Sequence, residues 1–138
     1  MNNIDNKELI KKLHDIWNTN NISAVPDVYS KNVVVHWSKS SQSPNSVGHV
    51  GIRQAITDTL RAFPDWHENI VDIIAEDDKI VTRYVSTGTH IGNYQGVVPT
   101  GNKIKVDEIS IFSIKNGKVT EQWCLVDDLA LLEQLRNS

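Results

Sequence analysis

Apolar residues near the start of the chain recur at three- and four-residue spacing, the period of a helix that buries one face. This pattern predicts a helix over residues 5–18, with Asp5 or Asn6 as its N-cap. The polar residues 18–21, three of them Asn, tolerate turn and left-handed conformations and end the helix. The apolar positions that carry the pattern are Leu9, Ile10, Leu13, Ile16 and Trp17.

A mixed segment over residues 23–46 precedes a second stretch in which apolar residues recur with the helical period. Residues 23–29, with a proline near the first turn, predict a short helix, and the β-branched run 33–37 predicts a strand. Residues 38–46 are Ser-rich and aperiodic, so we interpret them as an ordinary exposed loop rather than a functional lid. Residues 49–63 predict the longest helix, which ends before Pro64. Its apolar positions are Val50, Ile52, Ile56, Leu60 and Phe63.

From Trp66 onward, the spacing of apolar residues changes from the helical period to the two-residue period of strands. The predicted strands span residues 67–76, 79–91, 103–115 and 118–126. The turn signals between them are residues 76–78, the Gly92–Gly101 region and Asn116-Gly117, the last of which is typical of a type I′ hairpin. A closing helix follows, capped by Asp127 or Asp128, with Leu129, Leu131, Leu132 and Leu135 on its apolar side.

Helices first and four sequential strands afterwards predict one α+β domain over residues 1–138. We expect a strongly curved, mostly antiparallel sheet packed against three to four helices. The twist of such long strands leaves a concave cone under the helices, which can enclose a pocket.

Charge and composition narrow the function classes. Lys and Arg total 14 against 17 for Asp and Glu, and the charges are interspersed, which disfavours nucleic acid as a partner. The single cysteine, Cys124, suits a reducing compartment. The N-terminus lacks the apolar segment of a signal peptide, and no apolar run approaches a membrane span of about 18 residues. The sequence therefore predicts a cytoplasmic protein that does not bind membranes.

The strand over residues 103–115 carries the clearest candidate for chemistry. One of its faces is apolar at both ends, through Ile104 and Val106 and through Phe112 and Ile114, and should therefore point inward. Glu108 and Ser110 lie on the same face, between these apolar residues. A carboxylate there is costly unless it is paired, hydrated or protonated. Glu108 is then either a pocket acid, or a structural group that is paired with a base or reaches solvent at a rim.

Two histidines at the ends of predicted strands, His36 and His90, are weaker candidates. Either can serve as a neutral base or as a hydrogen-bond donor to a substrate oxygen, although a structural role is commoner for a lone histidine. The five histidines show no close ligand pair, so no metal is expected. No glycine-rich nucleotide motif is present, so no nucleotide cofactor is expected either. Cys124 is a nucleophile only where a base lowers its pKa, and a buried, inert thiol is the simpler interpretation.

Most of the aromatic residues belong to core positions. Because side chains do not fill a wide cone completely, we expect a subset of them to line a pocket. The predicted ligand-binding residues are Trp17, Tyr29, His36, Ser110, Phe112 and Cys124.

Several segments resemble the SnoaL-like polyketide cyclases over about residues 8–136. The most specific is the G-T-H-x-G-x-x-x-G-x-x-P-T-G pattern from Gly88 to Gly101. The others are residues 63–66 (F-P-D-W), residues 112–123 and residues 131–135. The resemblance implies the cone of the nuclear-transport-factor-2-like superfamily, an apolar cavity, no metal or organic cofactor, and a homodimer. In the cyclising members a carboxylate acid/base closes a ring by intramolecular aldol condensation.

The chain departs from the family at the catalytic positions. The family's acid/base Asp matches Cys124, its pocket His matches Ser110, and the polar residue two positions earlier matches Glu108. We therefore expect Glu108 with His90 to be a relocated catalytic pair. The first hypothesis is cofactor-independent acid/base chemistry, of the cyclase/aldol type or isomerase, on a small apolar carbonyl compound. The alternative is a non-catalytic module that binds a small hydrophobic ligand or a protein on the same fold.

Overall fold

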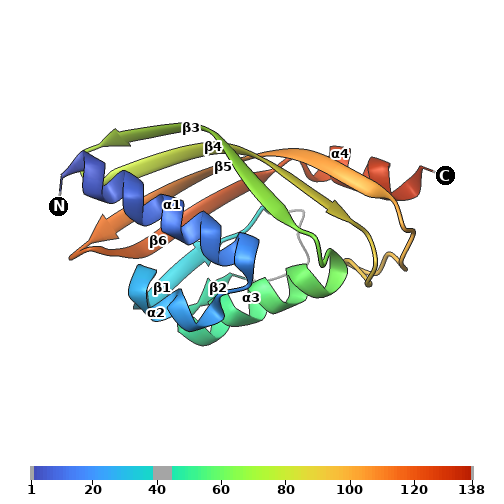
Figure 1. The fold of residues 1–138 in the computed structure, drawn as a ribbon, viewed down its shortest axis with the longest axis horizontal. Coiled ribbons are helices and arrows are strands. Elements are labelled where there is room, and N and C mark those ends of the chain that lie inside the picture. Colours follow the sequence, from blue (N-terminus) through green and yellow to red (C-terminus); the bar gives the residue numbers. More distant parts are fainter. Residues whose placement is uncertain (1, 39–44, 138) are drawn as a thin grey trace.

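The computed structural model describes residues 2–38 and 45–137, which form helices on the concave side of one curved sheet (Figure 1). The helical elements are α1 (Asn3–Thr19), a 3-10 turn (Ile22–Ala24), α2 (Val25–Val28), α3 (Gly48–Ala62) and α4 (Asp128–Arg136). The strands are β1 (Tyr29–His36), β2 (Ser46–Val47), β3 (His67–Glu76), β4 (Lys79–Thr89), β5 (Lys103–Lys115) and β6 (Lys118–Val126). The predicted α+β class is confirmed.

The sheet has six strands in the order β2-β1-β6-β5-β4-β3. Strands β3 to β6 form an antiparallel meander, and β1 joins β6 in parallel, so the sheet is mixed. The hairpin between β5 and β6 turns at Asn116 and Gly117, both at positive φ, as a type I′ turn requires. Long twisted strands wrap around the helices, which places the inward-facing side chains of β3 to β6 around a common interior.

Helices α1 and α3 cover the concave side of the sheet. Helix α1 packs on β3, and α3 packs on β1. Apolar side chains of both helices, including Leu13 and Ile56, join those of the strands in one buried cluster. Helix α4 closes the far end of β5, where Leu131 and Leu135 enter a second, smaller cluster. None of the helices in the described residues is long and apolar enough to cross a membrane.

Most predicted boundaries agree with the structure to within two residues, with four differences. The N-cap of α1 is Asn2, whose side chain accepts a hydrogen bond from the Asp5 N–H, whereas Asn6 lies inside the helix and is buried. At the other end of the chain, Asp127 caps α4 as predicted. Strand β1 begins four residues before the predicted strand, because Tyr29 already pairs with Val119 of β6.

The other two differences concern the end of β4 and the short helix over residues 23–29. Strand β4 ends at Thr89 rather than at residue 91, because the Ile91 and Gly92 N–H groups turn away to donate to the Ala62 carbonyl. The predicted short helix over residues 23–29 is a 3-10 turn followed by the single turn of α2. Residues 39–44 of the predicted loop lie outside the described residues.

Candidate functional site

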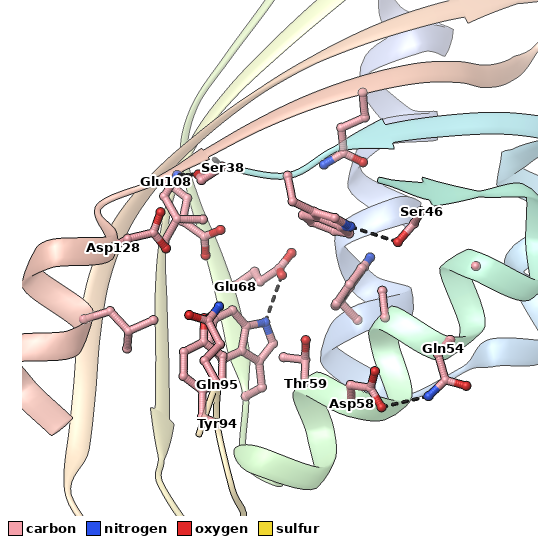
Figure 2. Close-up of a pocket in the computed structure, with 18 of the residues that line it drawn as sticks. Ser38, Ser46, Gln54, Asp58, Thr59, Glu68, Tyr94, Gln95, Glu108 and Asp128 are labelled. Carbon is pink, nitrogen blue, oxygen red and sulfur yellow. Dashed lines mark hydrogen bonds between the residues drawn. The ribbon is translucent and has the colours of Figure 1, made fainter. Parts of the chain in front are cut away.

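A pocket of about 610 Å³ lies between the concave face of the sheet and helices α1, α3 and α4 (Figure 2). This volume is typical of sites for small organic ligands. Its wall combines aromatic rings with a small set of polar groups. The aromatic residues that line it are Trp17, Trp37, Trp66, Tyr84 and Tyr94, and the ionisable residues include His14, Glu68, Glu108, Asp58 and Asp128.

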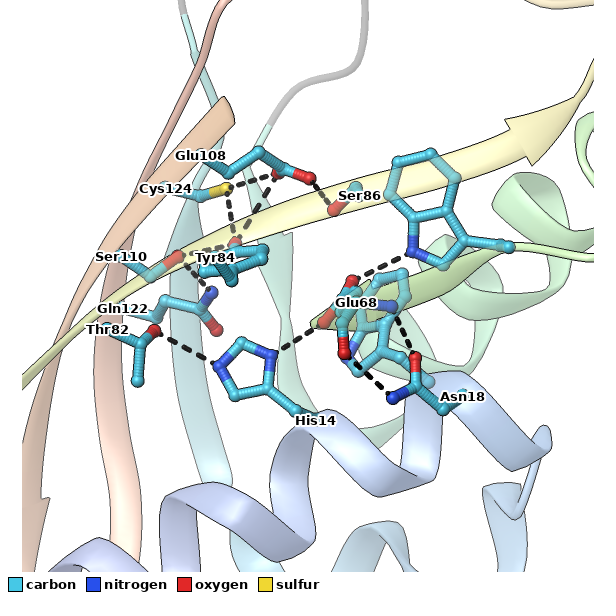
Figure 3. A network of polar contacts seen from close by, with 12 residues as sticks. His14, Asn18, Glu68, Thr82, Tyr84, Ser86, Glu108, Ser110, Gln122 and Cys124 are labelled. Carbon is cyan, nitrogen blue, oxygen red and sulfur yellow. Dashed lines mark hydrogen bonds and ion pairs between the residues drawn. The ribbon is translucent and has the colours of Figure 1, made fainter. Parts of the chain in front are cut away.

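Glu108 lies on the pocket wall because β5 alternates strictly between buried and exposed positions. Its side chain is 5% exposed. One carboxyl oxygen, Oε2, accepts a hydrogen bond from the Ser86 hydroxyl, and the other, Oε1, lies 3.4 Å from the Tyr84 hydroxyl and 3.5 Å from the Cys124 thiol (Figure 3). These described partners are neutral, so no basic side chain among them compensates a negative charge on Glu108.

Burial therefore decides the protonation state of Glu108. Loss of solvation raises the pKa of this carboxyl from 4.5 to about 8, the nearby charge of Glu68 adds to the rise, and the hydrogen bonds from Ser86, Cys124 and Tyr84 oppose it. At neutral pH the side chain is mainly a neutral carboxylic acid. Such a group can donate a hydrogen bond or a proton to a carbonyl oxygen in the pocket.

A directed chain of hydrogen bonds stands behind Glu108. The Gln122 amide donates to Ser110 Oγ over 3.1 Å, and the Ser110 and Tyr84 hydroxyls share a hydrogen bond over 2.9 Å. When the Tyr84 hydroxyl donates to Glu108, the Ser110 hydroxyl is the donor to the Tyr84 oxygen. Burial raises the pKa of both the Tyr84 hydroxyl and the Cys124 thiol well above their ordinary values. Cys124 is therefore a neutral thiol rather than a nucleophilic thiolate.

A second polar cluster lines the same pocket and joins α1 to β3 and β4 (Figure 3). His14 Nδ1 lies 2.7 Å from Glu68 Oε1, and His14 Nε2 lies 3.1 Å from the Thr82 hydroxyl. The Trp66 indole N–H donates to the other Glu68 oxygen over 2.9 Å. Asn18 binds both the N–H and the C=O of Glu68, which holds the backbone of β3 in place. The Glu68 carboxyl group is thus oriented on both of its oxygens.

The structure brings only part of the predicted set to the pocket. Trp17 and Glu108 line it, and Ser110 and Cys124 lie directly behind, in contact with Tyr84. Phe112 instead packs in the central cluster as a fully buried residue.

Tyr29 and His36 also lie away from the pocket wall. The Tyr29 hydroxyl accepts the Trp17 indole N–H over 3.0 Å inside the same central cluster. His36 stacks on Trp123 and pairs with Glu121 over 2.6 Å. Because Trp123 points to the outer face of the sheet, His36 is part of that face rather than of the pocket wall.

His90 has no described hydrogen bond to Glu108, so the structure does not bring the two predicted catalytic residues together. Its side chain is fully buried, its Nδ1 accepts the Thr100 N–H over 3.2 Å, and its ring packs against Phe63. Tyr84 is the direct partner of Glu108, and two further inward-facing residues of β4, Ser86 and Gly88, lie between Tyr84 and His90. His90 instead holds the 92–101 segment, whose Gly101 N–H donates to its carbonyl.

Sequence reasoning missed His14 and Glu68. His14 falls on the apolar stripe of α1 with Ile10 and Leu13, so helical period alone indicates that it is buried. Glu68 lies on a face of β3 that has no comparable run of apolar residues, because β3 is an edge strand with a bulge between Ile70 and Asp72. No signal in the sequence joins the two residues, which are 54 positions apart. Among the described residues, no three His, Cys, Asp or Glu side chains cluster as a metal site.

Known structures share this architecture. IdmH from Streptomyces antibioticus matches with a TM-score of 0.81 and 24% identity, over 94% of this chain and 97% of that one. TsrD from Streptomyces laurentii matches with a TM-score of 0.87 and 22% identity, over 99% and 98% of the two chains. A SnoaL-like polyketide cyclase from Agrobacterium tumefaciens matches with a TM-score of 0.79 and 15% identity, over 94% and 97%. These matches show the nuclear-transport-factor-2-like fold.

The sequence comparisons identify the family of the chain. A search of curated proteins found no significant match. A profile of the SnoaL-like polyketide cyclase family, however, matches residues 7–135, which is nearly the whole chain. The chain therefore belongs to the SnoaL-like polyketide cyclase family.

Proposed function

We propose that this protein is a cytoplasmic, cofactor-independent acid/base enzyme, of the cyclase/aldol type or an isomerase, that acts on a small apolar carbonyl compound. The observation that carries the proposal is Glu108. It lines an aromatic pocket, and burial raises its pKa to about 8, so it is present as an acid at neutral pH. A carboxylic acid in an apolar site is suited to protonating a carbonyl oxygen as an enol forms.

The surrounding residues suit the same chemistry. The aromatic wall formed by residues such as Trp17, Trp66 and Tyr94 holds an apolar substrate and excludes water, which strengthens the hydrogen bond from Glu108 to a carbonyl oxygen. Tyr84 and Ser86 fix the Glu108 carboxyl group. A fixed acid and a shaped pocket lower the barrier by orienting the substrate and supplying one proton.

Deuterium uptake by a simple ketone tests the proposal. We expect the protein to accelerate exchange of the α-hydrogens of 2-tetralone in D2O, followed by NMR. Glu108→Gln should slow this exchange by about 100-fold or more. Glu76→Gln, which changes an exposed carboxylate at the end of β3, should leave it unchanged. A Glu108→Gln protein that folds normally and exchanges at the wild-type rate would overturn the role of Glu108.

The binding-module alternative has its own support. Cys124 and Ser110 occupy the positions that match the acid/base Asp and the His of the family, and Cys124 is a neutral buried thiol. If wild-type protein binds 2-tetralone by tryptophan fluorescence but does not accelerate its exchange, the pocket is a binding site. If Cys124→Asp combined with Ser110→His then creates exchange, catalysis has been lost at these two positions.

We also propose that the protein is a homodimer that buries the outer face of the sheet. Four outward side chains form a row across β3 to β6, because their strands place them in direct register: Ile74, Val81, Ile111 and Trp123. Ile109 and Leu125 extend this row, and Leu125 is 66% exposed. A contiguous exposed apolar surface of this kind is typical of an interface. We call these six residues the outer apolar row.

The charges next to the outer apolar row favour a second copy of the same chain as the partner. Arg83 pairs with Asp72 over 2.8 Å, and His36 pairs with Glu121 over 2.6 Å. These groups are already paired within the chain, so a two-fold axis does not bury them as lone charges. Lys79, whose Nζ lies 5.9 Å from the Trp123 ring centroid, has to stay in solvent at the rim of the interface.

A further inference from the structure

Glu68 and Glu108 are two carboxyl groups of the same pocket with different partners. Glu68 pairs directly with Ser86 of β4 in the sheet register, and the Ser86 hydroxyl binds Glu108 of β5. The two glutamates are therefore two strands apart and offset by two residues along the strands, which places their backbones about 12 Å from each other. Their side chains converge on the pocket that both of them line (Figure 2). A substrate carbonyl and its α-carbon can lie between two such groups.

Protonation of the carbonyl oxygen by Glu108 leaves the α-hydrogen without an acceptor. Two of the other ionisable groups at the wall are less suited to accept it. Asp58 receives the Gln54 amide at the α3 side of the pocket, and His14 has Glu68 and Thr82 on its two nitrogens. Glu68 can use a remaining lone pair, because each of its oxygens accepts only one of the described side-chain hydrogen bonds.

We propose that Glu68 is the catalytic base of this pocket and that His14 is its positioning residue. This inference rests on the proposed acid/base function and adds the second group that the reaction needs. Trp66 and His14 hold the two oxygens of Glu68, and Asn18 holds its backbone. Such preorganisation on a helix and a strand is what a proton transfer requires.

The proton transfer is balanced as follows. The α C–H bond of the substrate breaks, and the proton passes to a Glu68 oxygen. The electron pair forms the C=C bond of the enol, while the carbonyl oxygen takes the proton of Glu108. In an isomerisation, the protonated Glu68 returns its proton to another carbon, and the enol O–H returns its proton to Glu108. In an aldol closure, the enol carbon attacks a second carbonyl, whose oxygen receives the proton from Glu68. The first carbonyl re-forms as the enol O–H returns its proton to Glu108.

A second cavity supports the same assignment. His14 and Glu68 also line a smaller, polar pocket of about 510 Å³ that is formed by residues of α1 and β3, among them Lys11, Asp15 and His67. The two residues thus separate the aromatic pocket from a polar one. A proton taken by Glu68 can exchange with water through the polar pocket without passing the substrate. Glu108, by contrast, lines only the first pocket.

The Kemp elimination of 5-nitrobenzisoxazole tests the base directly. In this reaction a base removes the C–H proton, the electron pair forms a nitrile, and the N–O bond breaks to release a coloured phenolate. We expect the protein to exceed the rate of acetate at the same carboxylate concentration by about 100-fold or more. Glu68→Gln should lose about 100-fold. Glu76→Gln is the matched control.

Two variants of His14 keep the test valid if Glu68→Gln does not fold. His14→Gln retains an N–H donor for Glu68 Oε1, and His14→Leu removes it. With His14 as a positioning residue, kcat falls about 10-fold further in His14→Leu, while KM for the probe stays within about twofold. Equal kcat values in the two variants would overturn the positioning role.

The outcomes separate this inference from the proposed function. A wild-type Kemp rate no faster than acetate, or an unchanged rate in folded Glu68→Gln, overturns the base assignment even if Glu108 controls 2-tetralone exchange. Conversely, loss of the Kemp reaction in Glu68→Gln, together with 2-tetralone exchange that is insensitive to Glu108→Gln, supports Glu68 as a base. It overturns only the role of Glu108.

Discussion

Glu108 and Glu68 differ in the groups that their carboxyl oxygens contact. Glu108 meets the Ser86 and Tyr84 hydroxyls and the Cys124 thiol, which are neutral, and burial raises its pKa to about 8. Glu68 meets an imidazole, which can carry a positive charge, and an indole N–H. Two carboxyl groups whose surroundings differ in this way can divide the roles of acid and base.

The raised pKa of Glu108 predicts how stability depends on pH. Between about pH 4.5 and about pH 8 the unfolded chain has released the Glu108 proton and the folded chain retains it. The free energy of unfolding therefore falls as pH rises through this window, by at most about 1.4 kcal/mol per pH unit from this group. Glu108→Gln removes this contribution. As pH rises, the unfolding free energy of the variant, measured by urea denaturation at several pH values, should therefore increase relative to that of wild type. Parallel curves would contradict the assignment.

Replacing Cys124 with Asp tests how the site tolerates a second acid. Cys124 Sγ lies 3.5 Å from Glu108 Oε1 in a buried position. A carboxylate there has no described basic partner, so at neutral pH Cys124→Asp should be less stable than Cys124→Ser by about 3 kcal/mol. The difference measured by urea denaturation should shrink near about pH 5, where both acids are protonated. A pH-independent difference would indicate that shape, not charge, limits this position.

At the scale of elements, α4 protects an open edge of the sheet. Strand β6 pairs with β5 only from Glu108 onward, which leaves the N–H and C=O of Lys105 without a strand partner. The Gln134 side chain supplies both bonds, since it donates to the Lys105 carbonyl over 3.0 Å and accepts from its N–H over 2.7 Å. The helix that carries Gln134 also contributes Leu131 to the pocket. Edge protection and pocket closure therefore depend on the same helix.

Removal of this side chain should loosen α4. Gln134→Ala deletes two exposed hydrogen bonds to Lys105 and one to the Ala130 carbonyl, and should cost about 1–2 kcal/mol of unfolding free energy in urea denaturation. Hydrogen exchange at the Lys105 N–H should also become faster, because its acceptor is gone. Glu133→Ala, at an exposed position of the same helix, should change stability by less than about 0.5 kcal/mol. Equal effects of the two substitutions would show that Gln134 does not hold α4.

Elements with a clear period could be predicted from sequence, and contacts between them could not. The alternation of β5 was sufficient to turn Glu108 and Ser110 inward, and Asn116-Gly117 was sufficient to place the hairpin. His90 has the same phase as Tyr84, yet it meets Phe63 rather than Glu108, because the sheet curves and the chain leaves β4 at Thr89. The period of apolar residues along a strand indicates which face a residue lies on. It does not indicate how far that residue is from a residue of another strand.

Across the whole molecule, the pleat of the strands directs successive side chains to opposite faces of the sheet. The inner side of β3 to β6 carries the polar groups of the pocket, and the outer side carries the outer apolar row. Neighbouring residues serve different faces: Glu108 and Ser110 point inward, while Ile109 and Ile111 point outward and are 42% and 39% exposed. A partner on the outer face can thus stiffen the strands that hold the pocket without entering it.

The homodimer can be tested at the centre of the outer apolar row. Ile111 is in register with both Val81 and Trp123, so Ile111→Lys places a charge in the middle of the interface. A stable dimer needs about 800 Å² of buried surface on each chain, and a central charge without a partner opposes its burial. Sedimentation velocity at micromolar concentration should show a dimer for wild type and a monomer for Ile111→Lys.

Val50→Lys is the control for this substitution. Val50 is 79% exposed on α3, away from the outer face of the sheet, so the charge there should leave the dimer intact. Ile111→Lys should still fold, because its side chain is already partly in solvent, and its Kemp rate per chain should stay within about twofold of wild type if the pocket is complete in one chain. A monomeric wild type, or a dimeric Ile111→Lys, would contradict the interface. A monomeric Ile111→Lys that loses its Kemp rate would instead show that the pocket depends on the sheet being held by its partner.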